Sequence, residues 1–385
     1  MTIYKIFRAL VIFIFILPVT SKIVANDFDT TFAAQWLEKN GTDPRGYLAQ
    51  KFDKYDIVIL GEEHRVHQFT EFVAGCIPAL YKHGVRELAM EFDYSINQPL
   101  IDSFLALPWL DNGLLYQFRR GRVGDSFGLF KEYADIFREC WQFNRALVQD
   151  STPFRIVALD LSSDDPSYEA EGGEWGRDSH MFKVLDREVI SRGKKVLVYC
   201  GWMHAMSRLV PPKLIDGRPS DKERRVRLGN HIQQSYPERV FSVFFYVPYL
   251  YTPDSIVTEL RLVIPVNGII EAVMERLGSK PLGFDMAPSP FAGLSSPGAY
   301  FRFIKKDWAM VDVCDGMLFL CPVKEWQAVV IENIYLSDSI FHSYAGRAGN
   351  AEDRLTDYLK VQARDPENTI RHIKTDAYDN VRIAE

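Results

Sequence analysis

The chain has 385 residues, 47% of them hydrophobic, which is enough for one large domain or two smaller ones with a substantial core. Its formal net charge of −6 makes it a poor non-specific ligand for nucleic acid. These features indicate a globular protein, and we expect no nucleic-acid partner.

Five cysteines are spread along the chain without a Cys-x-x-Cys pair, which excludes a disulfide-dense framework. Cys314 and Cys321 are near enough in sequence for a bridge, and the sequence leaves that pairing open. We expect most of the cysteines to be small buried apolar residues.

The N-terminus has the pattern of a secretory signal peptide. Lys5 and Arg8 precede an apolar run at 9–17, and residues 18–25 include small residues suited to cleavage. The run is shorter than the roughly 20 apolar residues that a spanning helix needs. We therefore expect residues 1–25 to be removed from an exported, periplasmic or secreted protein that keeps no transmembrane segment.

The next part of the chain predicts a strand–helix–strand unit. An apolar run at 57–60 ends at Gly61 and indicates a buried strand. Apolar residues between 69 and 80 recur at helical spacing, and residues 87–92 indicate a second strand. Such a unit is typical of parallel sheets, with a right-handed crossover.

Residues 95–150 are predicted to be a mostly helical insertion. Further strands are expected at 154–160, 195–200 and 240–247, with helices at 177–192 and 226–235 between them. A cluster of basic residues is expected on a solvated loop or helix face: Lys222, Arg224, Arg225 and Arg227.

The pattern changes after Pro248. Strand-like runs at 302–304 and 317–320 indicate a C-terminal α+β extension, and residues 323–385 have a helical pattern. The predicted fold class is therefore α/β, with a mostly parallel open sheet and helices on both of its faces. Its main domain is expected at 26–322, after the signal peptide.

Two strands end in the same motif, Gly-x-x-His, which places His64 and His204 at equivalent positions. Because parallel α/β sheets bind ligands just beyond the carboxyl ends of their strands, these loops predict a shared pocket. Glu91 interrupts an apolar strand and needs a partner, since burying an isolated carboxylate is costly. Arg177 opens the helix before the second motif, and Asp160 ends a strand.

Several neighbours allow two interpretations. Glu62 suits a general base or the N-terminus of the following helix, and His67 suits a second metal ligand or a solvated first turn. Arg177 suits substrate contact or a structural pair with Glu91 or Asp160. Glu63 is expected to face solvent.

The ordered set of motifs resembles one superfamily. Its parts are the segments at 61–64, 90–92, 97–105, 177–181 and 201–204. Together they are similar to the superfamily that contains the haem-binding ChaN-like proteins, the Tiki proteases and the erythromycin esterases, over about residues 55–247. The resemblance implies a mostly parallel α/β core with helices on both faces.

The resemblance also implies the pocket residues His64, Glu91, Arg177 and His204, with Glu62 beside them. Arg177 follows Glu91 by only 86 positions, too few for the long helical insertion of the erythromycin esterases, which disfavours macrolide hydrolysis. Conversely, the chain extends further past its last core strand than ChaN-like proteins usually do.

Two functions follow. In the first, an exported hydrolase activates water with His64 and Glu62 or Glu91, while Arg177 and His204 stabilise the oxyanion of a small-molecule or peptide substrate. A divalent metal held by His64, Glu91 and His204 is a variant of this mechanism.

In the second function, a non-catalytic protein binds haem or another iron compound for uptake. A histidine, Tyr94 or Tyr199 would then serve as an axial ligand, and Tyr199 and Trp202 would line the flat group. Core packing is the alternative for Tyr199 and Trp202.

Overall fold

The computed structural model describes residues 28–119, 127–215, 218–251, 261–296, 298–330, 332, 370–371 and 373–374. The predicted signal peptide and most of the predicted helical tail therefore lie outside the described residues. Within the described ranges, no helix has the length and apolar character needed to cross a bilayer. All five cysteines are free thiols, four of them buried, so Cys314 and Cys321 are not bridged.

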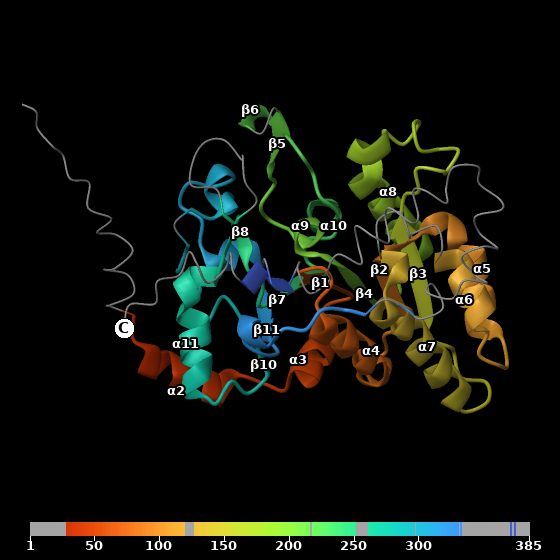
Figure 1. The fold of residues 1–385 in the computed structure, drawn as a ribbon, viewed down its shortest axis with the longest axis horizontal. Helices are drawn as coiled ribbons and strands as arrows, with labels where there is room; N and C mark the ends of the chain where they lie inside the picture. Colours follow the sequence, from red (N-terminus) through yellow and green to blue (C-terminus); the bar gives the residue numbers. More distant parts are fainter. Residues whose placement is uncertain are drawn as a thin grey trace, which may run out of the picture.

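The core of the described structure is a seven-stranded sheet in the order β10-β11-β7-β1-β4-β2-β3 (Figure 1). All neighbouring strands pair in parallel except β10 and β11, which confirms the predicted α/β class. The strands are β1 Ile57–Glu62, β2 Glu87–Tyr94, β3 Arg155–Asp160, β4 Val196–Gly201, β7 Val240–Phe245, β10 Leu282–Asp285 and β11 Gly316–Phe319.

Two small hairpins lie outside this sheet, β5 Pro212–Ile215 with β6 Arg218–Arg224, and β8 Tyr249–Tyr251 with β9 Arg261–Val263. The α-helices are α2 Thr30–Asn40, α3 Pro44–Gln50, α4 His67–Lys82, α5 Gln98–Ala106, α6 Asn112–Arg119, α7 Lys131–Ala146, α8 Gly173–Glu188, α9 Trp202–Ala205, α10 Leu228–Ser235, α11 Ile269–Arg276 and α12 Met310–Val313. Short 3-10 turns connect several of them.

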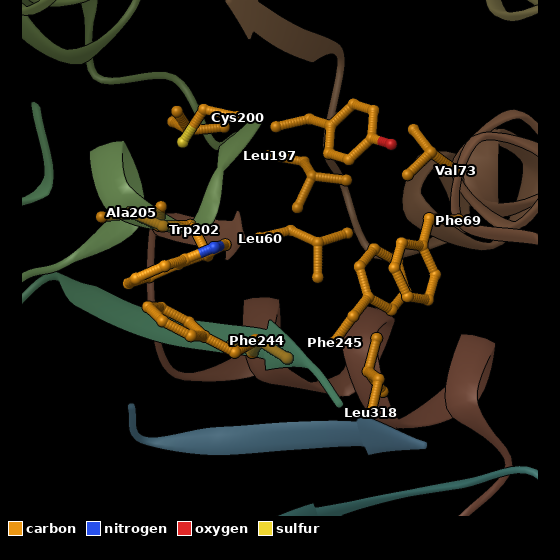
Figure 2. Close-up of a cluster of buried hydrophobic side chains, with 14 of the residues drawn as sticks. Leu60, Phe69, Val73, Leu197, Cys200, Trp202, Ala205, Phe244, Phe245 and Leu318 are labelled. Atoms are coloured by element: carbon orange, nitrogen blue, oxygen red, sulfur yellow. The ribbon is translucent and has the colours of Figure 1, made fainter. Parts of the chain in front are cut away.

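The two faces of the sheet bury different side chains because neighbours along a strand point to opposite sides. On one face, Leu60 and Leu197 pack with Phe245 beneath α4 (Figure 2). Phe69 of α4 stacks on Phe245 with ring centroids 4.3 Å apart. The predicted apolar stripe of α4 is buried here, as expected from its helical spacing.

The opposite face is covered by α8, α9 and α10. Cys200 and Phe244 lie on this face together with Ala205 and Trp202 of α9 (Figure 2). A Cβ at Gly61 would come within 2.9 Å of the Ala205 Cβ, so the glycine lets α9 approach the sheet closely. Helices on both faces agree with the sequence prediction.

Three local predictions differ from the structure. Residues 302 and 303 fall in a 3-10 turn, Tyr300–Phe303, with 304 directly after it, because Tyr300 and Phe301 are buried as one side of a turn and not as alternate strand positions. The basic residues Lys222 and Arg224 lie on strand β6, not on a loop or helix. Residues 323–330 form a 3-10 turn and an extended segment where a helical pattern was expected.

Candidate functional site

Four neighbouring parallel strands bring the predicted site residues to one edge of the sheet. The order β1-β4-β2-β3 places the ends of four strands in a row, and these strands carry Glu62, Gly201, Glu91 and Asp160. His64 follows β1, and His204 lies on α9 directly after β4. The structure therefore brings together all five residues predicted as catalytic.

Glu91 is the buried centre of the site. Its Oε1 accepts a hydrogen bond from Arg177 Nη2 at 2.9 Å and lies 3.4 Å from His204 Nε2. Its Oε2 accepts from the backbone N–H of Gly201 at 2.7 Å. Burial alone would raise the pKa of this carboxyl, but the charges of His204, Arg177 and His64 outweigh it and hold the pKa well below its usual range.

Arg177 is fixed by two carboxylates at once. Its Nε and Nη2 donate to the two oxygens of Asp160 at 2.5 and 2.7 Å, in addition to the bond to Glu91. The structural pairing considered from the sequence therefore exists with both acids. Arg177 Nη1 lies 3.4 Å from His204 Nε2, which places a guanidinium nitrogen beside the second imidazole.

His204 is held from behind by Asp178. The imidazole Nδ1 lies 2.5 Å from Asp178 Oδ1, and this oxygen also accepts from the backbone N–H of Leu228 at 2.8 Å. Burial would raise the pKa of Asp178, but His204 and Arg227 oppose this and lower it to about 2. A charged Asp178 therefore orients the ring so that Nε2 faces Glu91.

Glu62 orients the His64 ring in the same way, through its Nδ1 atom. Glu62 Oε1 lies 3.0 Å from His64 Nδ1 and accepts from the Tyr133 hydroxyl at 2.7 Å, while Oε2 accepts from the Tyr199 hydroxyl. Burial raises the pKa of Glu62 to about 7, even though His64 and Tyr133 favour the charged form.

His64 is the histidine that reaches solvent. Its side chain is 36% exposed, whereas Glu91 and His204 are buried. Burial would lower the pKa of His64, but the hydrogen bond to Glu62 and the charges of Glu91, Glu62 and Glu63 outweigh it and raise the pKa. Phe127 and Phe92 meet the ring edge-on, with centroids 4.9 and 5.7 Å away.

The Glu62–His64 pair and the Glu91–His204 pair start from opposite faces of the sheet. Glu62 shares a face with Tyr199, while Glu91 is on the side of α8 and α9. A Cβ built on Gly201 would lie 2.5 Å from His64 Cε1, 2.8 Å from its Nε2 and 3.5 Å from Glu91 Oε2. The His64 ring therefore reaches over the end of β4 at Gly201 and approaches the Glu91 carboxylate.

The loop that carries His64 is held by a C-terminal strap, residues 325–330. Val66 pairs with Ala328, and the Val329 N–H donates to the Arg65 carbonyl at 3.1 Å. Arg65 has a φ of 68°, which is costly for a residue with a side chain, and its own N–H donates to the Tyr133 hydroxyl. The strap also reaches α7, where the Val330 N–H donates to Glu132.

The remaining sequence predictions near the site have different outcomes. Glu63 is only half exposed and accepts from Trp202 Nε1 at 3.1 Å, so it does not simply face solvent. His67 begins α4, and its Nδ1 lies 3.0 Å from Glu132 Oε1, away from the Glu91 cluster. Asp160, expected at the end of a strand, also accepts from the Leu161 N–H and so caps the following turn.

The metal and haem ligands predicted from the sequence have other partners here. Both oxygens of Glu91 accept hydrogen bonds, one from Arg177 and one from Gly201. The positive guanidinium in contact with this carboxylate would repel a metal cation. Among the described residues, no group of three or more His, Cys, Asp and Glu side chains is arranged to hold a metal ion. The Tyr199 hydroxyl is buried against Glu62, so Tyr199 does not fit axial haem ligation, whereas haem ligation by Tyr94, half-buried at the end of β2, stays a prediction.

Two contributors were missed from the sequence. Asp178 directly follows Arg177, and its place one residue from the predicted arginine was the available signal. Tyr133 lies on α7 within the helical insertion, and nothing in its local sequence marks it as a partner of Glu62. Only the packing of α7 against α4 brings it to the site.

Comparison with known proteins gives similarity at the level of the fold. No family model matches the chain, and no curated protein matches it. A solved succinoglycan biosynthesis protein is similar with a TM-score of 0.55 and 10% identity, over 79% of this chain and 99% of that one. This likeness supports the same mostly parallel α/β fold.

Other solved structures are less similar. An erythromycin esterase mutant in its open conformation has a TM-score of 0.46 and 12% identity, over 71% of this chain and 92% of that one. A protein from Bacillus cereus has a TM-score of 0.43 and 12% identity, over 76% and 97%. A bacterial protein toxin has a TM-score of 0.34 and 18% identity, and the matched region is 36% of its length.

Substituting Gly201 with alanine should separate the two pairs without unfolding the protein. The new Cβ meets the end of a side chain, so the His64 ring is expected to swing away from Glu91. Its pKa should then fall, because the charge of Glu91 helps to raise it. Titration of the His64 ring by NMR measures this, with Gly46→Ala as a control whose Cβ meets only ordinary contacts. An unchanged His64 pKa in Gly201→Ala would contradict the placement of the His64 ring near Glu91.

Glu62 should make the protein less stable as pH rises. Its pKa is about 7 in the folded state against 4.5 for an unperturbed glutamate, so the folded protein binds the extra proton between these values. The free energy of unfolding should therefore fall across this window, by about 3 kcal/mol from this group. His64, whose pKa is also raised, acts in the same direction.

The test compares urea unfolding at pH 4.5 and pH 8. Glu62→Gln should lose much less stability over this interval than the unsubstituted protein, because its amide does not ionise. Glu139→Gln, which changes an exposed α7 carboxylate, is the control and should follow the original curve. An equal change in the free energy of unfolding between pH 4.5 and pH 8 in all three proteins would refute the raised pKa of Glu62.

Proposed function

We propose that this chain is an exported hydrolase in which the Glu62–His64 pair activates water for attack on an ester or amide carbonyl. The observation that carries the proposal is the convergence of two imidazoles on Glu91, each anchored at Nδ1 by its own carboxylate. An imidazole fixed at Nδ1 presents Nε2 to a reacting proton in one orientation.

His64 is the proposed general base because its side chain reaches solvent. A water beside Nε2 gives its proton to the imidazole while its oxygen bonds to the carbonyl carbon, and the carbonyl π electrons move to oxygen. When this tetrahedral intermediate collapses, the carbon–oxygen or carbon–nitrogen bond breaks and the leaving alcohol or amine takes the proton from His64. Glu62 stabilises the imidazolium between these steps.

Arg177 and His204 are the proposed stabilisers of the oxyanion. Their nitrogens Nη1 and Nε2 lie 3.4 Å apart, so one oxyanion can contact both. Asp160 and Glu91 fix the guanidinium, and Asp178 fixes the imidazole, so little reorganisation accompanies the reaction. The motif resemblance to a superfamily that includes esterases and proteases points to the same class of substrate.

Export is part of the proposal and rests on the sequence pattern of residues 1–25. N-terminal sequencing of protein recovered outside the cytoplasm tests it. A product that retains residues 1–25 would contradict the cleavage.

Loss of the base should abolish turnover. His64→Ala is expected to lower kcat for p-nitrophenyl esters or fluorogenic peptides by roughly 10²-fold or more, and Glu91→Gln should also be severely impaired. His67→Ala is the matched control, because this neighbouring histidine pairs with Glu132 and not with the Glu91 cluster. Activity that survives His64→Ala, or a saturable haem spectrum without any turnover, would refute the proposal.

The pH dependence of turnover should depend on Tyr133. The reaction needs the deprotonated Glu62–His64 pair, so kcat should rise with pH through its titration near neutrality. The Tyr133 hydroxyl favours charged Glu62, so Tyr133→Phe should move the midpoint upward by roughly half to one pH unit. Tyr81→Phe, whose hydroxyl donates to the Thr152 carbonyl, is the control. An unshifted midpoint in Tyr133→Phe would exclude this role.

A further inference from the structure

The β5–β6 hairpin forms a basic arm on a chain that is acidic as a whole. Between residues 208 and 227 there are seven lysines and arginines and three aspartates and glutamates, against a formal net charge of −6 for the chain. Arg218, Lys222 and Arg224 on β6 are exposed. The arm therefore presents concentrated positive charge to solvent.

An exposed tryptophan supports the arm. Trp175, in the first turn of α8, is 56% exposed. Lys213 Nζ lies 4.6 Å and Arg225 Cζ 5.0 Å from the centre of its ring, which is within the range of a cation–π contact. Arg225 also pairs with Glu174 at 3.1 Å, so the arm is fixed against α8 and is not a loose loop.

The same helix turn connects the arm to the candidate site. Trp175 lies two residues before Arg177, whose pKa is raised partly by the charge of Glu174. At the other end of the arm, Arg227 is buried and its Nη1 lies 3.4 Å from Asp178 Oδ2. Asp178 is the carboxylate that orients His204. The chain that leaves the arm is thus anchored to Asp178, a residue of the site, while the arm itself rests on Trp175.

We propose that the basic arm, defined as residues 212–215 and 218–225 with Trp175, binds an acidic segment of a peptide substrate beside the site. The proposal rests on the proposed hydrolase function, because a peptide supplies the amide carbonyl and its acidic side chains supply the charge that the arm complements. A compact set of cations held by a ring and by ion pairs is ordered before binding, which reduces the entropy lost on binding.

The test measures binding and turnover separately. Fluorescein-labelled poly-L-glutamate reports binding by anisotropy, and two fluorogenic peptides report turnover, one with four glutamates beside the cleaved bond and one with four glutamines. The variant is Lys222→Glu with Arg224→Glu, which changes only exposed side chains. A second variant, Trp175→Ala, removes the support for Lys213 and Arg225.

A matched control corrects for total charge. Lys82→Glu with Arg145→Glu makes the same charge change at exposed positions near the ends of α4 and α7. These helix ends precede β2 and β3, so they lie at the sheet edge opposite the site. This control should alter poly-L-glutamate binding by less than about twofold, since screening limits the reach of distant surface charges.

The β6 variant should bind poly-L-glutamate at least about tenfold more weakly, and kcat/KM for the glutamate peptide should fall in proportion. Turnover of the glutamine peptide should be unchanged. Trp175→Ala should also weaken poly-L-glutamate binding and lower kcat/KM for the glutamate peptide alone, but by a smaller factor. Wild-type binding should also weaken as ionic strength rises.

The proposal would be overturned if poly-L-glutamate affinity fell equally in the β6 variant and the control, or fell in neither. It would also be overturned if the protein bound dextran sulfate but not poly-L-glutamate. Poly-L-glutamate binding that depends on the arm, in a protein that cleaves neither peptide, would leave the arm as an acidic-peptide site and refute the hydrolase. Cleavage of both peptides with equal kcat/KM would support the hydrolase and refute the binding of acidic peptides by the arm.

Discussion

The arrangement at the edge of the sheet depends on the missing side chain of Gly201. A single Cβ there would come within 2.8 Å of His64 Nε2, in the space between that ring and Glu91. The backbone N–H of the same residue donates to Glu91. One glycine therefore serves two purposes, since it leaves room for the imidazole and supplies a hydrogen bond to the carboxylate beneath it.

The charges around this glycine are balanced, although most of them are buried. Glu91 and Asp160 share Arg177, and Asp178 lies between His204 and Arg227. Glu62 is the exception: burial raises its pKa to about 7, although His64 and the Tyr133 hydroxyl favour the charged form. Its different environment separates the acid–base behaviour of two carboxylates on adjacent parts of one sheet.

Much of this could be predicted from the sequence because the determinants are local. Apolar runs ending in Gly-x-x-His identified β1 and β4, and the buried acid in β2 signalled that a partner was needed. Tyr133 was not predictable, since it reaches Glu62 only through the packing of α7 on α4, a contact between residues distant in sequence. The run at 302–304 was misassigned because three apolar-rich residues fit a strand and a 3-10 turn equally well.

The strap at residues 325–330 has a consequence for how the protein is made. The backbone around Arg65 takes its costly conformation while bonded to Val329, and Val66 pairs with Ala328, more than 250 residues later in the chain. During synthesis the ribosome delivers β1 long before this segment emerges. The loop bearing His64 therefore reaches its final geometry as a late event in biogenesis, after the central strands have been translated.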